Sequence, residues 1–172
     1  MQLRPYQQDA VDSAVAWMRK STEPALLELA TGAGKSWIAA AIALWITKKT
    51  SKKVLVLQPS RELTQQNYEK YLATGEKASI FSASANSKCT RHNVVYATPK
   101  TVLNSISRFG DAFACVIVDE AHMTTPTIKQ IIAHIASKNP MLRVIGMTAT
   151  PYRLGTGYIY QYDATGEKVS KL

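Results

Sequence analysis

A glycine-containing segment, Leu29–Ser36, carries the clearest chemical signal in the sequence. Its glycines let the backbone fold into a nest of N–H groups that point at phosphate oxygens, and a helix that begins directly afterwards adds partial positive charge. Lys35 could reach the β- and γ-phosphates of a nucleotide, and the Ser36 hydroxyl could bind Mg²⁺. The segment departs from the strict pattern because Leu29 stands where the first glycine is expected. The residues expected around the phosphates are Thr31, Gly32, Ala33, Gly34, Lys35 and Ser36.

Two carboxylates form the second group of residues suited to phosphate chemistry. Asp119 and Glu120 directly follow the apolar run Ala114–Val118, which predicts a buried strand. Open α/β sheets bind their ligands at the carboxyl ends of the strands, so both side chains are expected at the nucleotide. Asp119 would bind Mg²⁺ directly or through water, and Glu120 would orient and polarise the attacking water. Taken alone, an acidic pair is more often a pair of solvated residues at a strand end, and the phosphate loop upstream is what favours the chemical interpretation.

The rest of the chain alternates apolar runs with helical stretches, as a parallel sheet covered by helices requires. Strands are predicted at residues 25–29, 53–58, 78–83, 93–97, 114–118 and 142–147. Helices are predicted at residues 5–20, 36–47, 60–72, 99–107 and 126–137. We therefore expect an α/β fold of the P-loop NTPase class, with a mainly parallel sheet between helical layers. Residues 1–151 would form this domain, and residues 152–172 a hairpin-like tail.

Composition narrows the range of partners and locations. The 172 residues include 21 Lys and Arg against 12 Asp and Glu, and the resulting net charge of +9 favours a polyanionic partner such as nucleic acid. The longest apolar run, Trp37–Ile46, is too short to span a membrane, and the first residues lack the apolar core of a signal peptide. We therefore expect a cytoplasmic location and no membrane association. Cys89 and Cys115 fit no zinc or redox spacing.

Six short motifs resemble, in their order along the chain, those of the DEAD/DEAH-box helicases of superfamily 2. They are Leu3–Gln7, Ala30–Ser36, Pro59–Leu63, Thr98–Pro99, Asp119–His122 and Thr148–Pro151. The first and last motifs are most similar to those of bacterial RadD-type and XPB-like helicases, and less closely to those of type III restriction enzyme motors. The resemblance covers about residues 3–162. It implies a RecA-like three-layer α/β/α domain that binds ATP and Mg²⁺.

The resemblance also implies roles for further side chains. Arg4 and Gln7 would lie at the adenine, which a side-chain amide can bind through one donor and one acceptor. His122 would connect the nucleotide site to Thr148 and Thr150, so that loss of the γ-phosphate is transmitted to the nucleic acid. Each of these assignments has a plainer alternative, in which the same side chains cap helices, end strands or are solvated.

Two predicted helices begin directly after strands, at Ser60 and Thr98. Free N–H groups at such helix starts can bind phosphates without reading bases, and Arg61 and Lys100 add positive charge. These four residues are the candidate nucleic-acid contacts, although ordinary helix capping would explain the same pattern. The subfamily resemblance favours DNA over RNA as the partner.

The helicases that the sequence resembles bind ATP between two RecA-like domains, the second of which supplies arginine fingers. No segment here resembles the arginine-finger motif. We therefore expect the chain to be the first half of an ATP-dependent DNA helicase or translocase motor, with the second RecA-like domain on the same native polypeptide. Alone it would bind nucleotide and hydrolyse it poorly. A restriction-enzyme motor and an ATP-gated nucleic-acid-binding module stay open as alternatives.

Overall fold

A seven-stranded sheet in the order β1-β7-β6-β2-β5-β3-β4 forms the centre of the computed structural model. The structure describes residues 1–83, 87–149, 152–153, 157–158, 160–162 and 168–170. Every neighbouring pair of strands is parallel except β3 and β4, which confirms the predicted mainly parallel sheet. The strands are β1 (Ala25–Glu28), β2 (Lys53–Leu57), β3 (Ser79–Ser82), β4 (Ser87–Lys88), β5 (Val94–Ala97), β6 (Phe113–Asp119) and β7 (Arg143–Thr148).

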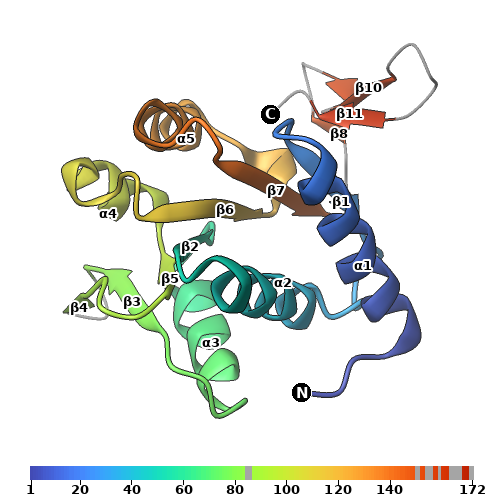
Figure 1. The fold of residues 1–172 in the computed structure, drawn as a ribbon, viewed down its shortest axis with the longest axis horizontal. Helices are drawn as coiled ribbons and strands as arrows, with labels where there is room; N and C mark the ends of the chain where they lie inside the picture. The colour runs from blue at the N-terminus through green and yellow to red at the C-terminus, as the bar shows by residue number, and fades with distance from the viewer. Residues whose placement is uncertain (84–86, 150–151, 154–156, 159, 163–167, 171–172) are drawn as a thin grey trace.

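Helices cover both faces of the sheet, as Figure 1 shows. One apolar core joins the sheet to α1, α2 and α3, and a second core joins its other face to α4 and α5. The three-layer α/β/α architecture expected from the sequence is therefore present. The helices are α1 (Pro5–Lys20), α2 (Lys35–Thr50), α3 (Arg61–Leu72), α4 (Pro99–Leu103) and α5 (Pro126–Lys138), with short 3₁₀ helices η1 (Ile106–Arg108) and η2 (Ala121–Met123).

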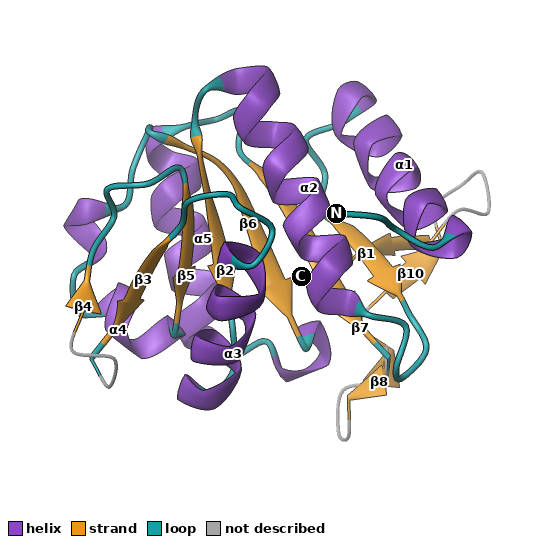
Figure 2. Ribbon diagram, turned by 90° about the horizontal axis from the view of Figure 1, so that it is seen from below, coloured by secondary structure: helices purple, strands orange, loops and turns teal. Residues whose placement is uncertain are grey.

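The strand order determines where the functional loops meet. β7 pairs with β1 on one side and with β6 on the other. Because these strands are parallel, the segments that follow all three leave the sheet at the same edge (Figure 2). The loop after β1 must therefore approach the acidic end of β6 across the end of β7.

The helix predicted over residues 99–107 is shorter than expected. α4 ends at Leu103, and η1 follows after a turn in which the Ser105 N–H donates to the Val102 carbonyl. This break carries Phe109 into the core, where its ring lies edge-on to Phe81 at 5.1 Å between centroids. A regular helix to residue 107 would give up this aromatic packing.

The tail contains the predicted hairpin. β10 (Tyr160–Tyr162) pairs antiparallel with β11 (Lys168–Ser170), and its turn at residues 163–167 lies outside the described residues. A second antiparallel pair joins β8 (Tyr152–Arg153) to β9 (Gly157–Tyr158). The expected domain boundary at residue 151 stays a prediction, because that residue is also outside the described part. Within that part, no helix is both long and apolar enough to cross a bilayer.

Replacing Phe109 with alanine tests the aromatic packing that ends α4. The ring is fully buried between Phe81 and Phe113, so Phe109→Ala should lower the free energy of unfolding by about 3–5 kcal/mol. Urea denaturation followed by circular dichroism measures the change. Met141→Ala is the control, because that side chain is 63% exposed and its loss should cost less than about 0.5 kcal/mol. Equal losses in the two variants would contradict the packing argument.

Candidate functional site

The loop between β1 and α2 is a tight turn that depends on two glycines. The backbone φ angles of Gly32 and Gly34 are 80° and 76°, values that residues with a side chain rarely adopt. Gly34 is the N-cap of α2, and a Cβ atom there would collide with the side-chain amide of Gln7. α2 begins at Lys35, so the first N–H groups of the helix point toward the loop. The turn and the helix start predicted for the segment are therefore present, and its binding of phosphate stays a prediction.

Lys35 and the acidic strand end meet beside this loop. The Lys35 Nζ atom lies 2.5 Å from Glu120 Oε1, in a pair whose side chains are 17% and 27% exposed. Asp119 is buried, and its Oδ1 atom accepts a hydrogen bond from the Glu120 N–H at 2.9 Å. Burial raises the pKa of Asp119 above its ordinary value, against the opposing effects of that hydrogen bond and of the Lys35 charge. Three charged residues that the sequence assigned to one site are therefore together.

Ser36 and Asp119 have the oxygen donors with which a Mg²⁺ ion could be held jointly with a nucleotide. Ser36 is in the first turn of α2, and Asp119 is the last residue of β6. Across residues 1–83 and 87–149, no three His, Cys, Asp or Glu side chains form a metal cage. Mg²⁺ in nucleotide sites needs only one or two carboxylates, because phosphates and water complete its coordination. A cation beside Asp119 would also offset the cost of burying that carboxylate.

The amino-terminal segment contacts the loop through Gln7. The Gln7 Nε2 atom donates to the Ala33 carbonyl at 2.9 Å, and its Oε1 accepts from the Arg4 N–H at 2.9 Å. Gln7 is buried, so it is not a solvated helix residue, and its amide retains one N–H and one lone pair for a ligand. The Arg4 side chain is exposed, and among the described residues it makes no hydrogen bond or ion pair with the loop. Tyr6, which the sequence analysis did not single out, also donates to the Ala33 carbonyl at 3.1 Å.

His122 joins the acidic strand end to β7. Its Nδ1 atom lies 2.8 Å from Thr148 Oγ1 and 3.4 Å from Glu120 Oε2. Thr148 is the last residue of β7, and its carbonyl accepts the Leu29 N–H at 2.9 Å. The expected contact between His122 and Thr148 is therefore present, and it reaches both the loop and the acidic end. Thr150, the other residue expected there, lies outside the described residues.

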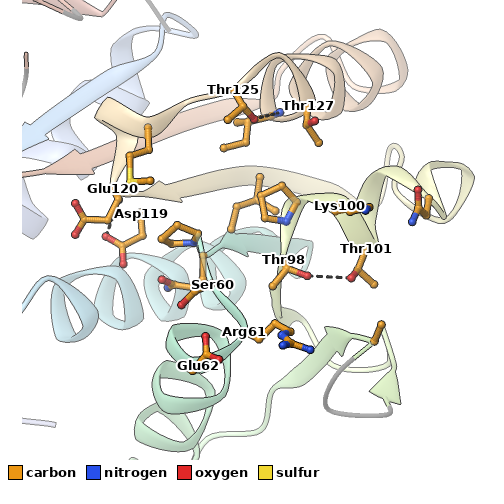
Figure 3. Close-up of a pocket in the computed structure, with 18 residues that line it drawn as sticks. Ser60, Arg61, Glu62, Thr98, Lys100, Thr101, Asp119, Glu120, Thr125 and Thr127 are labelled. Atoms are coloured by element: carbon orange, nitrogen blue, oxygen red, sulfur yellow. Dashed lines mark hydrogen bonds between the residues drawn. The ribbon is translucent and has the colours of Figure 1, made fainter. Parts of the chain in front are cut away.

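A cleft of about 710 Å³ extends from the acidic end along the carboxyl edge of β2 and β5. Asp119 and Glu120 line it together with the four candidate nucleic-acid contacts, Ser60, Arg61, Thr98 and Lys100. Figure 3 shows the starts of α3 and α4 on this cleft, with Asp119 and Glu120 at one end.

The two helix starts that line this cleft differ in their capping. Ser60 caps α3 by accepting the Leu63 N–H at 3.2 Å, as predicted. The Thr98 hydroxyl instead donates to the Thr101 hydroxyl at 2.9 Å, so Thr98 makes no side-chain cap. Arg61 and Lys100 are exposed, so both charges are accessible to a ligand in the cleft.

Two further polar residues at the site were not predicted from the sequence. Gln58 follows β2 and lines the cleft, and its buried Oε1 atom has no hydrogen-bond partner in the described part of the chain. The sequence does carry a pattern that could predict Gln58, because it directly follows an apolar strand, as Asp119 does. The Lys70 Nζ atom lies 3.4 Å from Ser36 Oγ, although Lys70 is near the other end of α3. No sequence motif marks Lys70, because only the packing of α3 against α2 brings it to the loop.

Known proteins resemble the chain along most of its length. A Methanocaldococcus jannaschii relative, provisionally named an ATP-dependent RNA helicase, is 32% identical over 164 residues, which are 88% of this chain and 20% of that protein. The ATP-dependent DNA helicase fml1 of Schizosaccharomyces pombe is 29% identical over 163 residues, which are 86% of this chain and 19% of that protein. The chain thus spans about a fifth of the length of these relatives.

A solved structure and a family model agree with this resemblance. The structure of the UvsW helicase from bacteriophage T4 matches with a TM-score of 0.69 and 24% identity, covering 88% of this chain and 54% of UvsW, and it shares the fold. The model of the family described as "Type III restriction enzyme, res subunit" matches residues 1–153. The closer likeness to RadD-type and XPB-like helicases stays a prediction. The chain therefore belongs to the ResIII family and has the RecA-like fold of a helicase domain.

Proposed function

We propose that this chain binds Mg-ATP at the loop of residues 29–36 and a nucleic-acid backbone in the neighbouring cleft, as the ATP-binding half of a helicase or translocase motor. The observation that carries the proposal is the contact between Lys35 and Glu120, which joins a phosphate-binding loop to an acidic strand end. ATP-dependent helicases among the relatives support it.

In the ligand-free site Lys35 and Glu120 neutralise one another. The phosphates of ATP carry more negative charge than one carboxylate, so Lys35 exchanges Glu120 for a phosphate oxygen when the nucleotide binds. Glu120 is then free to accept a hydrogen bond from the attacking water and orient it. Asp119 and Ser36 would hold Mg²⁺, which neutralises charge on the phosphates. Nucleotide binding thus prepares the residue that hydrolysis requires.

The same exchange reaches β7 through His122. Glu120 Oε2 and Thr148 Oγ1 lie 3.4 Å and 2.8 Å from His122 Nδ1. When Glu120 exchanges Lys35 for water, its contact with His122 changes. The hydrogen bond between His122 and Thr148 then changes too, and Thr148 moves the start of the segment after β7. We propose that this is how the chain couples the nucleotide to its nucleic acid, with Thr150 acting in the same segment.

Phosphates of the nucleic acid would lie along the cleft at the starts of α3 and α4. Arg61 and Lys100 would supply exposed positive charge, and Ser60 and Thr98 mark the two helix starts. Such contacts bind backbone without reading sequence. We assign DNA as the nucleic acid, in keeping with the RadD-type and XPB-like resemblance. The relatives named above include one DNA and one RNA helicase, so the test must compare both polymers.

Efficient hydrolysis would need a second RecA-like domain. An arginine finger stabilises the charge that develops on the transferred phosphate and contributes about 10³–10⁵ in rate. Among the described residues that line the cleft, the arginine is Arg61. It lies at the start of α3 with the candidate nucleic-acid contacts, and we do not assign it as an arginine finger. We propose that the missing cation comes from the second domain of the same polypeptide. The family match favours one alternative, in which this motor domain is part of a type III restriction enzyme. An endonuclease region on the same polypeptide would identify that case.

Replacing Lys35 tests the nucleotide site. Lys35→Ala should weaken binding of a fluorescent ATP analogue with Mg²⁺ at least about tenfold, because the ammonium contacts phosphate, while circular dichroism stays unchanged. Lys49→Ala is the matched control, since Lys49 is exposed on the last turn of α2.

The partner variant Glu120→Gln sharpens this test. It removes the carboxylate that competes with phosphate for Lys35, so nucleotide affinity should be kept or increased while hydrolysis falls. Unchanged affinity in Lys35→Ala would contradict the assignment of the loop.

Replacing both exposed cations tests the cleft. The double variant Arg61→Ala, Lys100→Ala should bind a single-stranded oligonucleotide more weakly. The slope of log binding constant against log salt concentration should be shallower by about 1.4, because each lost phosphate contact reduces the slope by about 0.7. Fluorescence anisotropy with DNA and RNA of one sequence measures both quantities. The double variant Lys49→Ala, Lys77→Ala, which removes two exposed charges outside the cleft, controls for net charge, and an equal effect there would place the nucleic acid elsewhere.

Replacing the Thr148 hydroxyl tests the coupling. Thr148→Val keeps the shape of the side chain and removes its contact with His122, so nucleotide affinity should change less than about twofold. The factor by which nucleotide alters oligonucleotide affinity should fall toward one. Measuring oligonucleotide binding with and without nucleotide gives this factor, and Thr22→Val on the surface is the control. Intact coupling in Thr148→Val would show that the signal takes another route.

A further inference from the structure

Lys70 brings a second ammonium group to the phosphate loop. Its Nζ atom lies 3.4 Å from the hydroxyl oxygen of Ser36, in a partly buried contact between α3 and the first turn of α2. Ser36 is the hydroxyl that would bind Mg²⁺ under the proposed function. One oxygen atom therefore faces both a lysine of this chain and the expected position of the metal.

The two lysines at the loop have different partners. Lys35 is paired with Glu120, whereas the ion pairs of the described part of the chain do not include Lys70. The ammonium of Lys70 therefore has no carboxylate partner among the described residues, and its charge remains available to an anionic ligand.

An ammonium group and a divalent cation at the same oxygen of Ser36 repel one another strongly. The hydroxyl has a lone pair for each, but the repulsion between two positive charges at such short range favours departure of the ammonium when the metal binds. The lysine stem is long and flexible, so its ammonium can move to a neighbouring acceptor without a change of the backbone. In a nucleotide site, the acceptors beside the metal are phosphate oxygens.

We propose that Lys70 is a second phosphate-binding cation of the nucleotide site, which occupies the hydroxyl of Ser36 in the empty site and moves to a phosphate oxygen when nucleotide binds. The inference rests on the proposed function. Lys70 partly replaces the metal, so that the chain retains affinity for nucleotide without Mg²⁺. Because Lys70 and Mg²⁺ neutralise the same phosphate charge, removing the lysine makes the nucleotide site respond to lower concentrations of the metal.

Nucleotide titrations with and without metal test this role in the 172-residue chain. A fluorescent ATP analogue is titrated in excess Mg²⁺ and in EDTA, and Mg²⁺ is then titrated at fixed nucleotide. Lys70→Gln should weaken metal-free binding at least about tenfold, change Mg-nucleotide binding less than about threefold, and lower the Mg²⁺ concentration at half-maximal binding. Lys70→Arg keeps the charge and should retain metal-free binding. Lys77→Gln, which removes a surface charge outside the site, should match the unmodified chain.

The pattern across the two conditions separates the possible outcomes. Equal weakening with and without Mg²⁺ in Lys70→Gln would overturn the inference, because a general structural or charge effect acts on both. Unchanged binding in both conditions would overturn it as well, since Lys70 would then make no phosphate contact. If the unmodified chain bound nucleotide in neither condition, the proposed function would fall and this inference with it. Thermal unfolding of each variant verifies that the fold is retained.

Discussion

The ion pair between Lys35 and Glu120 is the interaction on which the rest of the site depends. It joins the loop after β1 to the end of β6 across 85 residues of sequence. An ion pair of this exposure contributes little to stability by itself, because solvent screens it and both side chains lose freedom. Under the proposed function its importance is chemical, because it would keep the cation expected at the phosphates and the carboxylate expected at the attacking water paired with one another until nucleotide binds.

The sheet makes this pairing possible through the position of β7. Residue Thr148 ends that strand between β1 and β6, with its carbonyl bound to Leu29 and its hydroxyl to His122. The strand between the loop and the acidic end is therefore also the one that leads into the tail. Under the proposed function, a change at the nucleotide would reach the segment after β7 through these two hydrogen bonds.

Local patterns in the sequence were sufficient for most of the fold and for the centre of the site. Glycine spacing predicted the loop, and an apolar strand followed by carboxylates predicted the acidic end, because both signals lie within a few consecutive residues. The break after α4 was not predictable in this way, because it depends on the packing of Phe109 against Phe81, which is 28 residues away in the sequence. Lys70 was missed for the same reason. Its role comes from the packing of α3 against α2, which no local pattern encodes.

Glu120 also has a backbone conformation unusual for its residue type. Its φ of 50° and ψ of 51° are left-handed, which costs an L residue about 1–2 kcal/mol relative to ordinary helical backbone. Glycine would relieve that strain but would remove the carboxylate. A carboxylate at this position therefore lowers stability locally, because the left-handed backbone there favours glycine. Selection for stability alone would replace Glu120.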